Sequence, residues 1–199
     1  MANQVAQKIC KLQQLMESNQ AWGKSYGVFS RIIKKYKLKI GIEVGVAFGG
    51  HAENLLTETK IDQLIGIDPY RYQNDYDDQM DLSQNYLDVI YNFTLQRLKK
   101  FGKRYKHLRM FSKTAASQVS KKIDFVYIDA NHAYKSIQTD LAIWSSKVRK
   151  GGIIGGHDYL NKEFSHPGVN KAVDEFVKQH KVALNKHNSS VWWFIKDFE

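Results

Sequence analysis

Cysteine and proline are nearly absent from this sequence. Its 199 residues include one cysteine, Cys10, and two prolines, Pro69 and Pro167. A single thiol cannot form an internal disulfide and cannot build a metal site from thiolates. Because no linker rich in proline, glycine or serine divides the chain, we expect one domain, with N-terminal helices over residues 1–38 and a core over residues 40–199.

Long apolar runs are missing as well. No run approaches the roughly 20 residues needed to cross a bilayer, and the first ten residues lack the apolar centre of a signal peptide. The lone cysteine is consistent with a reducing compartment. We therefore expect a soluble, cytoplasmic protein with no membrane partner.

Positive charge is in excess. The net charge is +10, from 30 Lys and Arg against 20 Asp and Glu. Such an excess is typical of a nucleic-acid partner, an anionic substrate or a solvated basic surface. The basic residues are spread widely, with short clusters at residues 31–39, 97–106 and 147–150, and none interleaves with a nucleic-acid-binding motif. We favour the solvated surface and predict no nucleic-acid partner.

The most informative stretch is residues 40–70, whose pattern predicts a strand, a glycine-bearing turn, a helix and a second strand. Residues 40–44 are strand-like, residues 52–59 carry apolar side chains at helical spacing, and residues 64–67 form another short apolar run. Glycines in such a turn let the backbone approach a ligand, and the following helix points N–H groups at it. The stretch predicts a cradle for a nucleotide-like cofactor.

Two carboxylates flank this turn. Glu43 precedes Gly45 and Gly49, and Asp68 ends the second strand, 68 − 45 = 23 residues beyond the first glycine. This is near the spacing of about 20 residues at which an acid meets ribose hydroxyls. Ala47 stands where the dinucleotide fingerprint requires glycine, which disfavours pyrophosphate, while the preceding acid favours an amine-bearing ligand. The alternative is an ordinary turn whose glycines only permit close packing.

Strands and helices alternate along the rest of the chain. We expect strands over residues 107–111, 122–129, 153–156, 181–184 and 191–196, and helices over residues 5–16, 29–36, 87–101, 130–148 and 169–177. Gly102 and the pair Gly151–Gly152 are expected to end two of these helices, and residues 69–86 to form a loop or lid over a site. The order predicts a three-layer, mostly parallel α/β sheet closed by an antiparallel hairpin.

Polar side chains follow two of the later strands. Asp129 and His132 lie just after one, and His157 and Asp158 just after the next. Because ligands bind beyond the carboxyl ends of the strands in an open α/β sheet, we expect these side chains to converge on one cavity. The alternative is that the two acids cap helices and the two histidines are ordinary hydrogen-bonding residues.

The E-x-G-x-x-x-G turn and the later acid resemble motifs I and II of class I S-adenosylmethionine-dependent methyltransferases. The resemblance extends over nearly the whole chain from Ile40 onward. It implies the Rossmann-like fold of that class, a single catalytic core, and S-adenosyl-L-methionine as cofactor. The cofactor contacts that it implies are Glu43, Gly45, Val46, Gly49, Asp68, Asp129, Ser112 and Lys113.

The spacing D-x-x-H-x-Y at Asp129, His132 and Tyr134 is similar to that of metal-dependent O-methyltransferases that act on sugars and antibiotic scaffolds. The resemblance implies that His132 is the base for a substrate hydroxyl, and that Asp129 and Asp158 are ligands of a divalent cation. His157 stands where those relatives have a second acid. As a third ligand it would shift the preference from Mg²⁺ toward Mn²⁺, or else no metal binds.

Three other functions stay open at this point. An RNA methyltransferase would suit the charge, but the sequence after residue 128 lacks the motif of base-amine methylation. An NAD-dependent reductase would share the cradle, but no tyrosine has a lysine four positions later. A non-catalytic nucleotide-binding protein would tolerate changes at the strand ends. We predict a methyltransferase acting on a small-molecule, sugar-like hydroxyl, and the sequence leaves the oligomeric state open.

Overall fold

The computed structural model describes residues 7, 9–11, 13–14, 23–74, 80–119, 122–160 and 166–199. Most of the helix predicted over residues 5–16 lies outside these residues, as does the centre of the predicted lid at residues 75–79.

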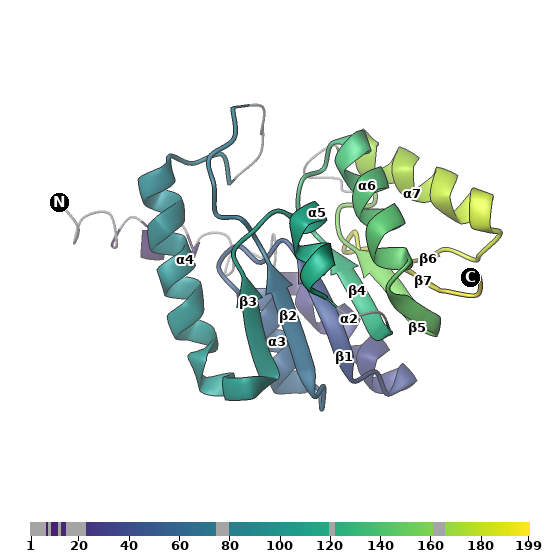
Figure 1. Ribbon diagram of the computed structural model, residues 1–199, viewed down its shortest axis with the longest axis horizontal. Helices are drawn as coiled ribbons and strands as arrows, with labels where there is room; N and C mark the ends of the chain where they lie inside the picture. The colour runs from purple at the N-terminus through teal and green to yellow at the C-terminus, as the bar shows by residue number, and fades with distance from the viewer. Residues whose placement is uncertain are drawn as a thin grey trace.

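One sheet of seven strands forms the centre of the molecule (Figure 1). Its strands are β1 (Ile40–Val44), β2 (Gln63–Ile67), β3 (Tyr105–Leu108), β4 (Ile123–Ile128), β5 (Val148–Gly156), β6 (Asn185–Lys186) and β7 (Trp192–Ile195). They lie in the order β3-β2-β1-β4-β5-β7-β6. The first five are parallel, and β7 pairs antiparallel with both of its neighbours. The predicted fold class is confirmed.

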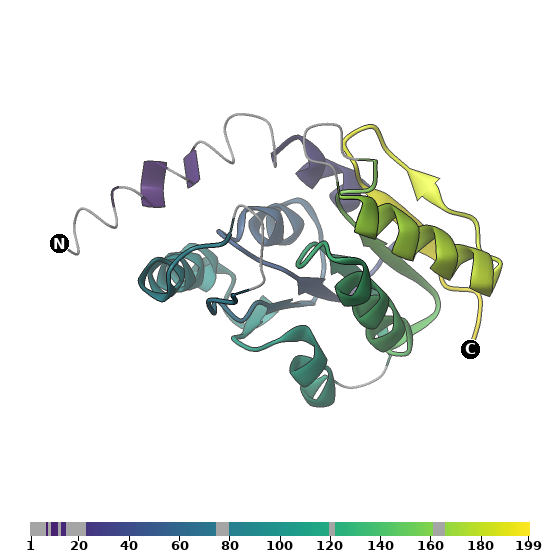
Figure 2. The same cartoon turned by 90° about the horizontal axis from the view of Figure 1, so that it is seen from above.

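Helices cover both faces of the sheet. They are α2 (Gly23–Tyr36), α3 (Gly50–Glu58), α4 (Gln84–Leu98), α5 (Ser112–Ala115), α6 (Tyr134–Ser145) and α7 (Pro167–His180). One apolar core joins α5, α6 and α7 to Ile42, Val126 and Ile154, and another joins α2 and α3 to Leu64 and Phe125 on the opposite face. Figure 2 shows α5 and α6 on the other side of the sheet from α3. Alternate residues of each strand therefore enter different cores, as the pleat requires.

Several predicted boundaries are wrong in the second half of the chain. β3 ends at Leu108 rather than at residue 111, and α6 ends at Ser145. Val148, placed on the helix because of its spacing, begins β5 instead. Gly151, expected to close the helix, lies inside that strand with φ of 75°, and the register of β5 on β4 shifts nearby. A left-handed glycine in a strand produces such an irregularity.

Two further boundaries also differ. The predicted strand over residues 181–184 is absent from the described residues, and the two-residue strand β6 lies in the segment expected to be a turn. α4 ends at Leu98, before the predicted end at Gly102, and a 3-10 segment (Lys99–Arg104) follows. Gly102 has φ of 53° and ψ of −128°, so it breaks this segment rather than capping an α-helix.

Basic and acidic residues are distributed differently at the two ends of the parallel strands. A cation directly precedes four of the five parallel strands: Lys39, Arg104, Lys122 and Lys147 before β1, β3, β4 and β5. Carboxylates gather at the other edge, where the strands end: Glu43, Asp68, Asp129 and Asp158.

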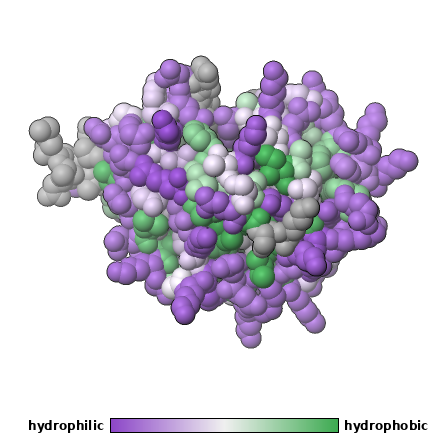
Figure 3. All heavy atoms as spheres, viewed as in Figure 1, coloured by the Kyte–Doolittle hydropathy of each residue, from purple (hydrophilic) through white to green (hydrophobic). Residues whose placement is uncertain are grey.

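Polar side chains cover most of the face in Figure 3, and apolar ones gather toward its middle. Within the described residues, no helix is long and apolar enough to cross a bilayer.

Candidate active site

The glycine turn after β1 packs directly on the end of β4. Gly45 has φ of 88°, and a Cβ added to it would lie 1.8 Å from the backbone oxygen of Asp129. Only glycine adopts this backbone conformation readily and also lets the backbone of Asp129 come so close. Gly49, with φ of 76°, begins α3 and faces α4, while Val46 is buried beneath the turn. Ala47, the departure from the dinucleotide pattern, adopts a left-handed φ of 46° without being glycine.

Asp68 holds the turn against the end of β2. Its Oδ2 accepts hydrogen bonds from the backbone N–H groups of Val46 and Ala47, at 3.0 and 3.1 Å. Its Oδ1 accepts one from the N–H of Tyr70 at 2.9 Å. A carboxylate has about four acceptor positions, so these bonds leave roughly one for a ribose hydroxyl. The predicted ribose contact is thus compatible with the structure through a single hydrogen bond.

Glu43 is buried beneath the turn rather than exposed beside it. Its exposed fraction is 1%, and its Oε1 lies 2.7 Å from Nδ1 of His51 on α3. Burial, reinforced by the charges of Asp129 and Asp68, raises the pKa of Glu43 well above its usual range, while burial lowers the pKa of His51 to about 3. Both shifts favour the uncharged forms, so the contact is a hydrogen bond between a carboxyl group and an imidazole rather than an ion pair. The sequence analysis missed His51, although it follows Glu43 by eight residues.

A cavity of about 590 Å³ opens at the ends of β2 and β3. Its lining includes Pro69 and Tyr70, which follow Asp68, and Met110, Phe111 and Thr114 around the start of α5. The apolar side chains of Met110 and Phe111 suit a stacked, planar base, and Arg71, Gln84 and Arg109 add polar groups to the lining. The residues present therefore fit the adenosine half of the predicted cofactor.

The start of α5 is fixed by a buried polar network. The Ser112 hydroxyl donates to Asp140 on α6 and accepts a hydrogen bond of 2.8 Å from Nε1 of Trp144. The side chain of Ser112 thus points into the protein, which leaves its backbone for the predicted adenine contact. Lys113 is exposed. Burial raises the pKa of Asp140 to about 6, although the hydrogen bond from Ser112 opposes this shift.

This network predicts a dependence of stability on pH. The unfolded chain releases the Asp140 proton near pH 3.8 and the folded chain near pH 6, so the free energy of unfolding should fall as pH rises between these values. We expect the free energy of unfolding of Asp140→Asn to exceed that of the wild type by on the order of 2 kcal/mol at pH 7. This difference should disappear below pH 4. Urea titrations across this range measure the difference. A difference in the free energy of unfolding that does not change with pH would contradict the raised pKa of Asp140.

The four residues at the ends of β4 and β5 do converge. Nε2 of His132 lies 2.9 Å from Oδ2 of Asp158 and 3.9 Å from Oδ1 of Asp129. Nδ1 of His157 lies 3.2 Å from Oδ1 of Asp158. Asp158 therefore stands between two imidazoles. Its φ of 62° is unusual for a residue other than glycine, and such strained positions cluster at functional sites.

His157 acts as a counter-ion in this arrangement. Its Nε2 donates to the backbone oxygen of Ser189 at 3.0 Å, and its Nδ1 faces Asp158. Burial alone would lower the pKa of His157, but the hydrogen bond to Asp158 and the charge of Asp129 outweigh it and raise the pKa to about 9. The same contacts with His132 and His157 outweigh burial and hold the pKa of Asp158 far below its usual range. The three predicted metal ligands do lie together, with one ligand atom each of Asp129, His157 and Asp158 within 4.8 Å of the others, and His157 would have to lose a proton to bind an ion.

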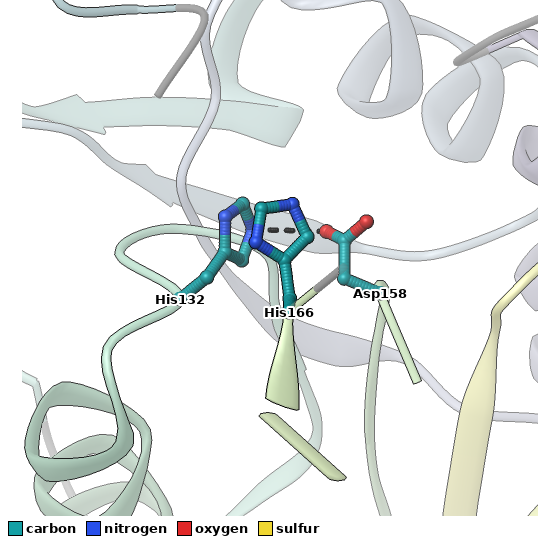
Figure 4. Close-up of side chains that lie close together, drawn as sticks. All are labelled: His132, Asp158 and His166. Atoms are coloured by element: carbon teal, nitrogen blue, oxygen red, sulfur yellow. Dashed lines mark ion pairs between the residues drawn. The ribbon is translucent and has the colours of Figure 1, made fainter. Parts of the chain in front are cut away.

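A third histidine, which the sequence analysis missed, joins this group. The ring of His166, just before α7, lies against the ring of His132 with centroids 4.1 Å apart (Figure 4). The triplet His166-Pro167-Gly168 at a helix start was the signal available in the sequence, because proline at the first helical position fixes where the preceding side chain lies.

The fold and the arrangement of the strand ends define a class I methyltransferase. A family model described as a methyltransferase domain matches residues 38–159, a segment that contains the glycine turn, Asp68, Asp129, His132 and Asp158. The chain belongs to this family, and the predictions of family, fold and enzyme class are confirmed.

A viral protein is similar to this chain over part of its length. An uncharacterized protein of Acanthamoeba polyphaga mimivirus is 29% identical over 141 residues, which are 68% of this chain and 58% of that protein. The chain thus covers less than two thirds of this relative's length.

Solved structures share the fold. A Staphylococcus aureus protein assigned to the caffeoyl-CoA O-methyltransferases has a TM-score of 0.68 and 16% identity, over 94% of this chain and 91% of that one. A Bacillus cereus O-methyltransferase in complex with SAH has a TM-score of 0.62 and 10% identity, over 94% and 90%. A TDP-rhamnose 3′-O-methyltransferase of calicheamicin biosynthesis has a TM-score of 0.61 and 13% identity, over 97% and 93%.

Proposed function

We propose that this protein uses S-adenosylmethionine to methylate a hydroxyl group of a small, sugar-like molecule, with His132 as the base. The observation that carries the proposal is the contact of 2.9 Å between His132 and Asp158. It lies at the carboxyl ends of the strands, where the glycine turn meets the end of β4. A carboxylate at this distance orients an imidazole and stabilises its charged form, as a general base requires. The named activities of the structural neighbours support transfer to oxygen and a small acceptor.

The cofactor would lie across the ends of β1, β2 and β4. Asp68 would hold the ribose, the cavity by Met110 and Phe111 the adenine, and the turn at Gly45 the amino acid end. Glu43 would face that end only through its buried, protonated carboxyl group, so we assign it to positioning the turn. When bound, S-adenosylmethionine supplies a methyl group that an oxygen nucleophile can displace from sulfur.

The chain then has to position the acceptor and take up its proton. The hydroxyl oxygen forms a bond to the methyl carbon as the carbon–sulfur bond breaks, and the hydroxyl proton passes to His132. Both ring nitrogens of His132 are shielded from solvent, which keeps this proton off bulk water. Asp158 stabilises the resulting imidazolium. If a divalent cation assists, the oxygens of Asp129 and Asp158 would hold it and it would acidify the hydroxyl.

Cofactor binding tests this proposal first. We expect the protein to bind S-adenosylmethionine and S-adenosylhomocysteine but not NAD in calorimetric titrations. Asp68→Asn should weaken binding about 10-fold or more, because it removes a charge-assisted hydrogen bond to the ribose. Asp62→Asn, an exposed acid at the other end of β2, is the matched control and should bind normally. Binding of NAD alone, or of none of the three, would overturn the proposal.

A further inference from the structure

Two overlapping groups of potential metal ligands lie at the strand ends: the set that the resemblance implied, Asp129, His157 and Asp158, and a second set, His132, Asp158 and His166. His132 comes from the loop before α6, Asp158 from the end of β5, and His166 from the start of α7 (Figure 4). One ligand atom of each lies within 4.8 Å of the others. In a tetrahedral zinc site with bonds of roughly 2.0–2.2 Å, ligand atoms are about 3.3–3.6 Å apart. Closing this cluster on an ion therefore needs only small side-chain movements.

The backbone holds the two histidines together. A Cβ added to Gly168 would lie 2.6 Å from the backbone oxygen of His132 and 2.7 Å from the backbone nitrogen of Tyr134. Glycine at this position lets the first turn of α7 touch the loop that carries His132, which brings His166 beside it. The loop is itself fixed by Asn131, whose Oδ1 accepts a hydrogen bond of 2.8 Å from the N–H of Ala133.

We propose that His132, Asp158 and His166 bind a transition metal ion of the Zn²⁺ type. Two imidazole nitrogens and one carboxylate oxygen are a donor set for zinc and similar ions, whereas Mg²⁺ prefers oxygen ligands. Three protein ligands also leave a fourth position for water or another small ligand. The set shares Asp158 with the cation site implied by resemblance, but replaces Asp129 and His157 with two imidazoles.

The ion would control the proposed active site. A ring nitrogen of His132 that is bonded to a metal has no lone pair to accept a proton, so the loaded enzyme loses its base. This consequence rests on the proposed function, while the metal site itself does not. We therefore expect micromolar or tighter Zn²⁺ to inhibit methyl transfer reversibly, and EDTA to restore it.

Cobalt(II) provides a readout that is independent of activity, because Co²⁺ with four ligands absorbs visible light far more strongly than Co²⁺ in water. We would titrate CoCl₂ into the untagged, EDTA-treated full chain, record the visible spectrum, and then displace Co²⁺ with ZnCl₂. We expect one equivalent to give intense visible bands that Zn²⁺ removes.

Two variants separate the competing ligand sets. His166→Gln should lower Zn²⁺ affinity about 100-fold or more, because losing a ligand costs at least as much as losing its outer-shell support. Asp129→Asn should retain the Co²⁺ bands. His180→Gln, at the other end of α7, is the matched control for removing an imidazole and should bind Co²⁺ like the wild type.

Two results would overturn the metal site: no intense bands in the wild type, or bands that survive His166→Gln and vanish in Asp129→Asn. Thermal melting of each apo variant identifies one that has failed to fold. In that case Gly168→Ala, which should separate the two histidines, provides a second variant in which the Co²⁺ bands should be lost. Calorimetry with S-adenosylmethionine on the same samples tells the two proposals apart. Bands without cofactor binding would refute only the proposed function.

Discussion

Replacing Gly45 by alanine is expected to lower the free energy of unfolding by about 2–5 kcal/mol and to abolish cofactor binding. The new Cβ would lie 1.8 Å from the backbone oxygen of Asp129, and the residue would keep a φ of 88° that alanine disfavours. The backbone of β4 cannot move away without pulling on its parallel pairing with β1. Urea unfolding and calorimetry with S-adenosylhomocysteine measure the two effects.

Gly151→Ala is the matched control for backbone conformation. Gly151 has φ of 75°, but the nearest atom to its added Cβ is Nη1 of Arg149 at 3.5 Å, an ordinary contact. We expect Gly151→Ala to lower the free energy of unfolding by about 1–2 kcal/mol, because of the left-handed conformation alone. Equal losses in the two variants would mean that the close approach between Gly45 and β4 has no energetic weight.

His132→Gln is expected to reduce turnover by about 10² to 10⁴ with little change in affinity for S-adenosylmethionine. Glutamine keeps a polar side chain of similar length but cannot take a proton at neutral pH. The base acts only in the transition state, so the loss should appear in kcat. Formation of S-adenosylhomocysteine with an excess of a hydroxylated acceptor measures it, in EDTA-treated protein and again after Mg²⁺ is added, so that loss of a cation is not mistaken for loss of the base.

His187→Gln is the control for this experiment, because His187 is an exposed histidine in the turn between β6 and β7 and should be dispensable for turnover. If His132→Gln turned over at the wild-type rate, His132 would not be the base, and the contact with Asp158 would be structural. Loss of cofactor affinity in the same variant would instead indicate a change in the shape of the site.

The sequence predicted the strand ends well, because their signals are local. Strand β4 ends in the apolar run Phe125–Ile128 directly before Asp129, and the glycine turn has a fixed order of residue types. The start of β5 was mispredicted for a physical reason. Val148 continues the apolar spacing of α6, and its assignment to a strand depends on pairing with Ile123, a contact that spacing along one segment cannot reveal.

The parts of the site that escaped prediction are contacts between distant segments. Only the packing of α7 brings His166 to His132, and only the packing of α3 on the sheet brings His51 against the buried Glu43. The hydroxyl of Ser112 likewise donates a hydrogen bond to Asp140, which is 28 residues away in the sequence. Residue type and spacing identify candidates at strand ends, but the desolvation that decides their protonation arises in the folded state.

The acidic residues at the carboxyl ends of the strands matter for a cationic ligand, because the protein as a whole is cationic. A sulfonium ligand meets net repulsion at long range, and at these strand ends it meets the carboxylates of Asp68 and Asp129. The orientation of the molecule at encounter, rather than its total charge, then governs how often such a ligand is captured.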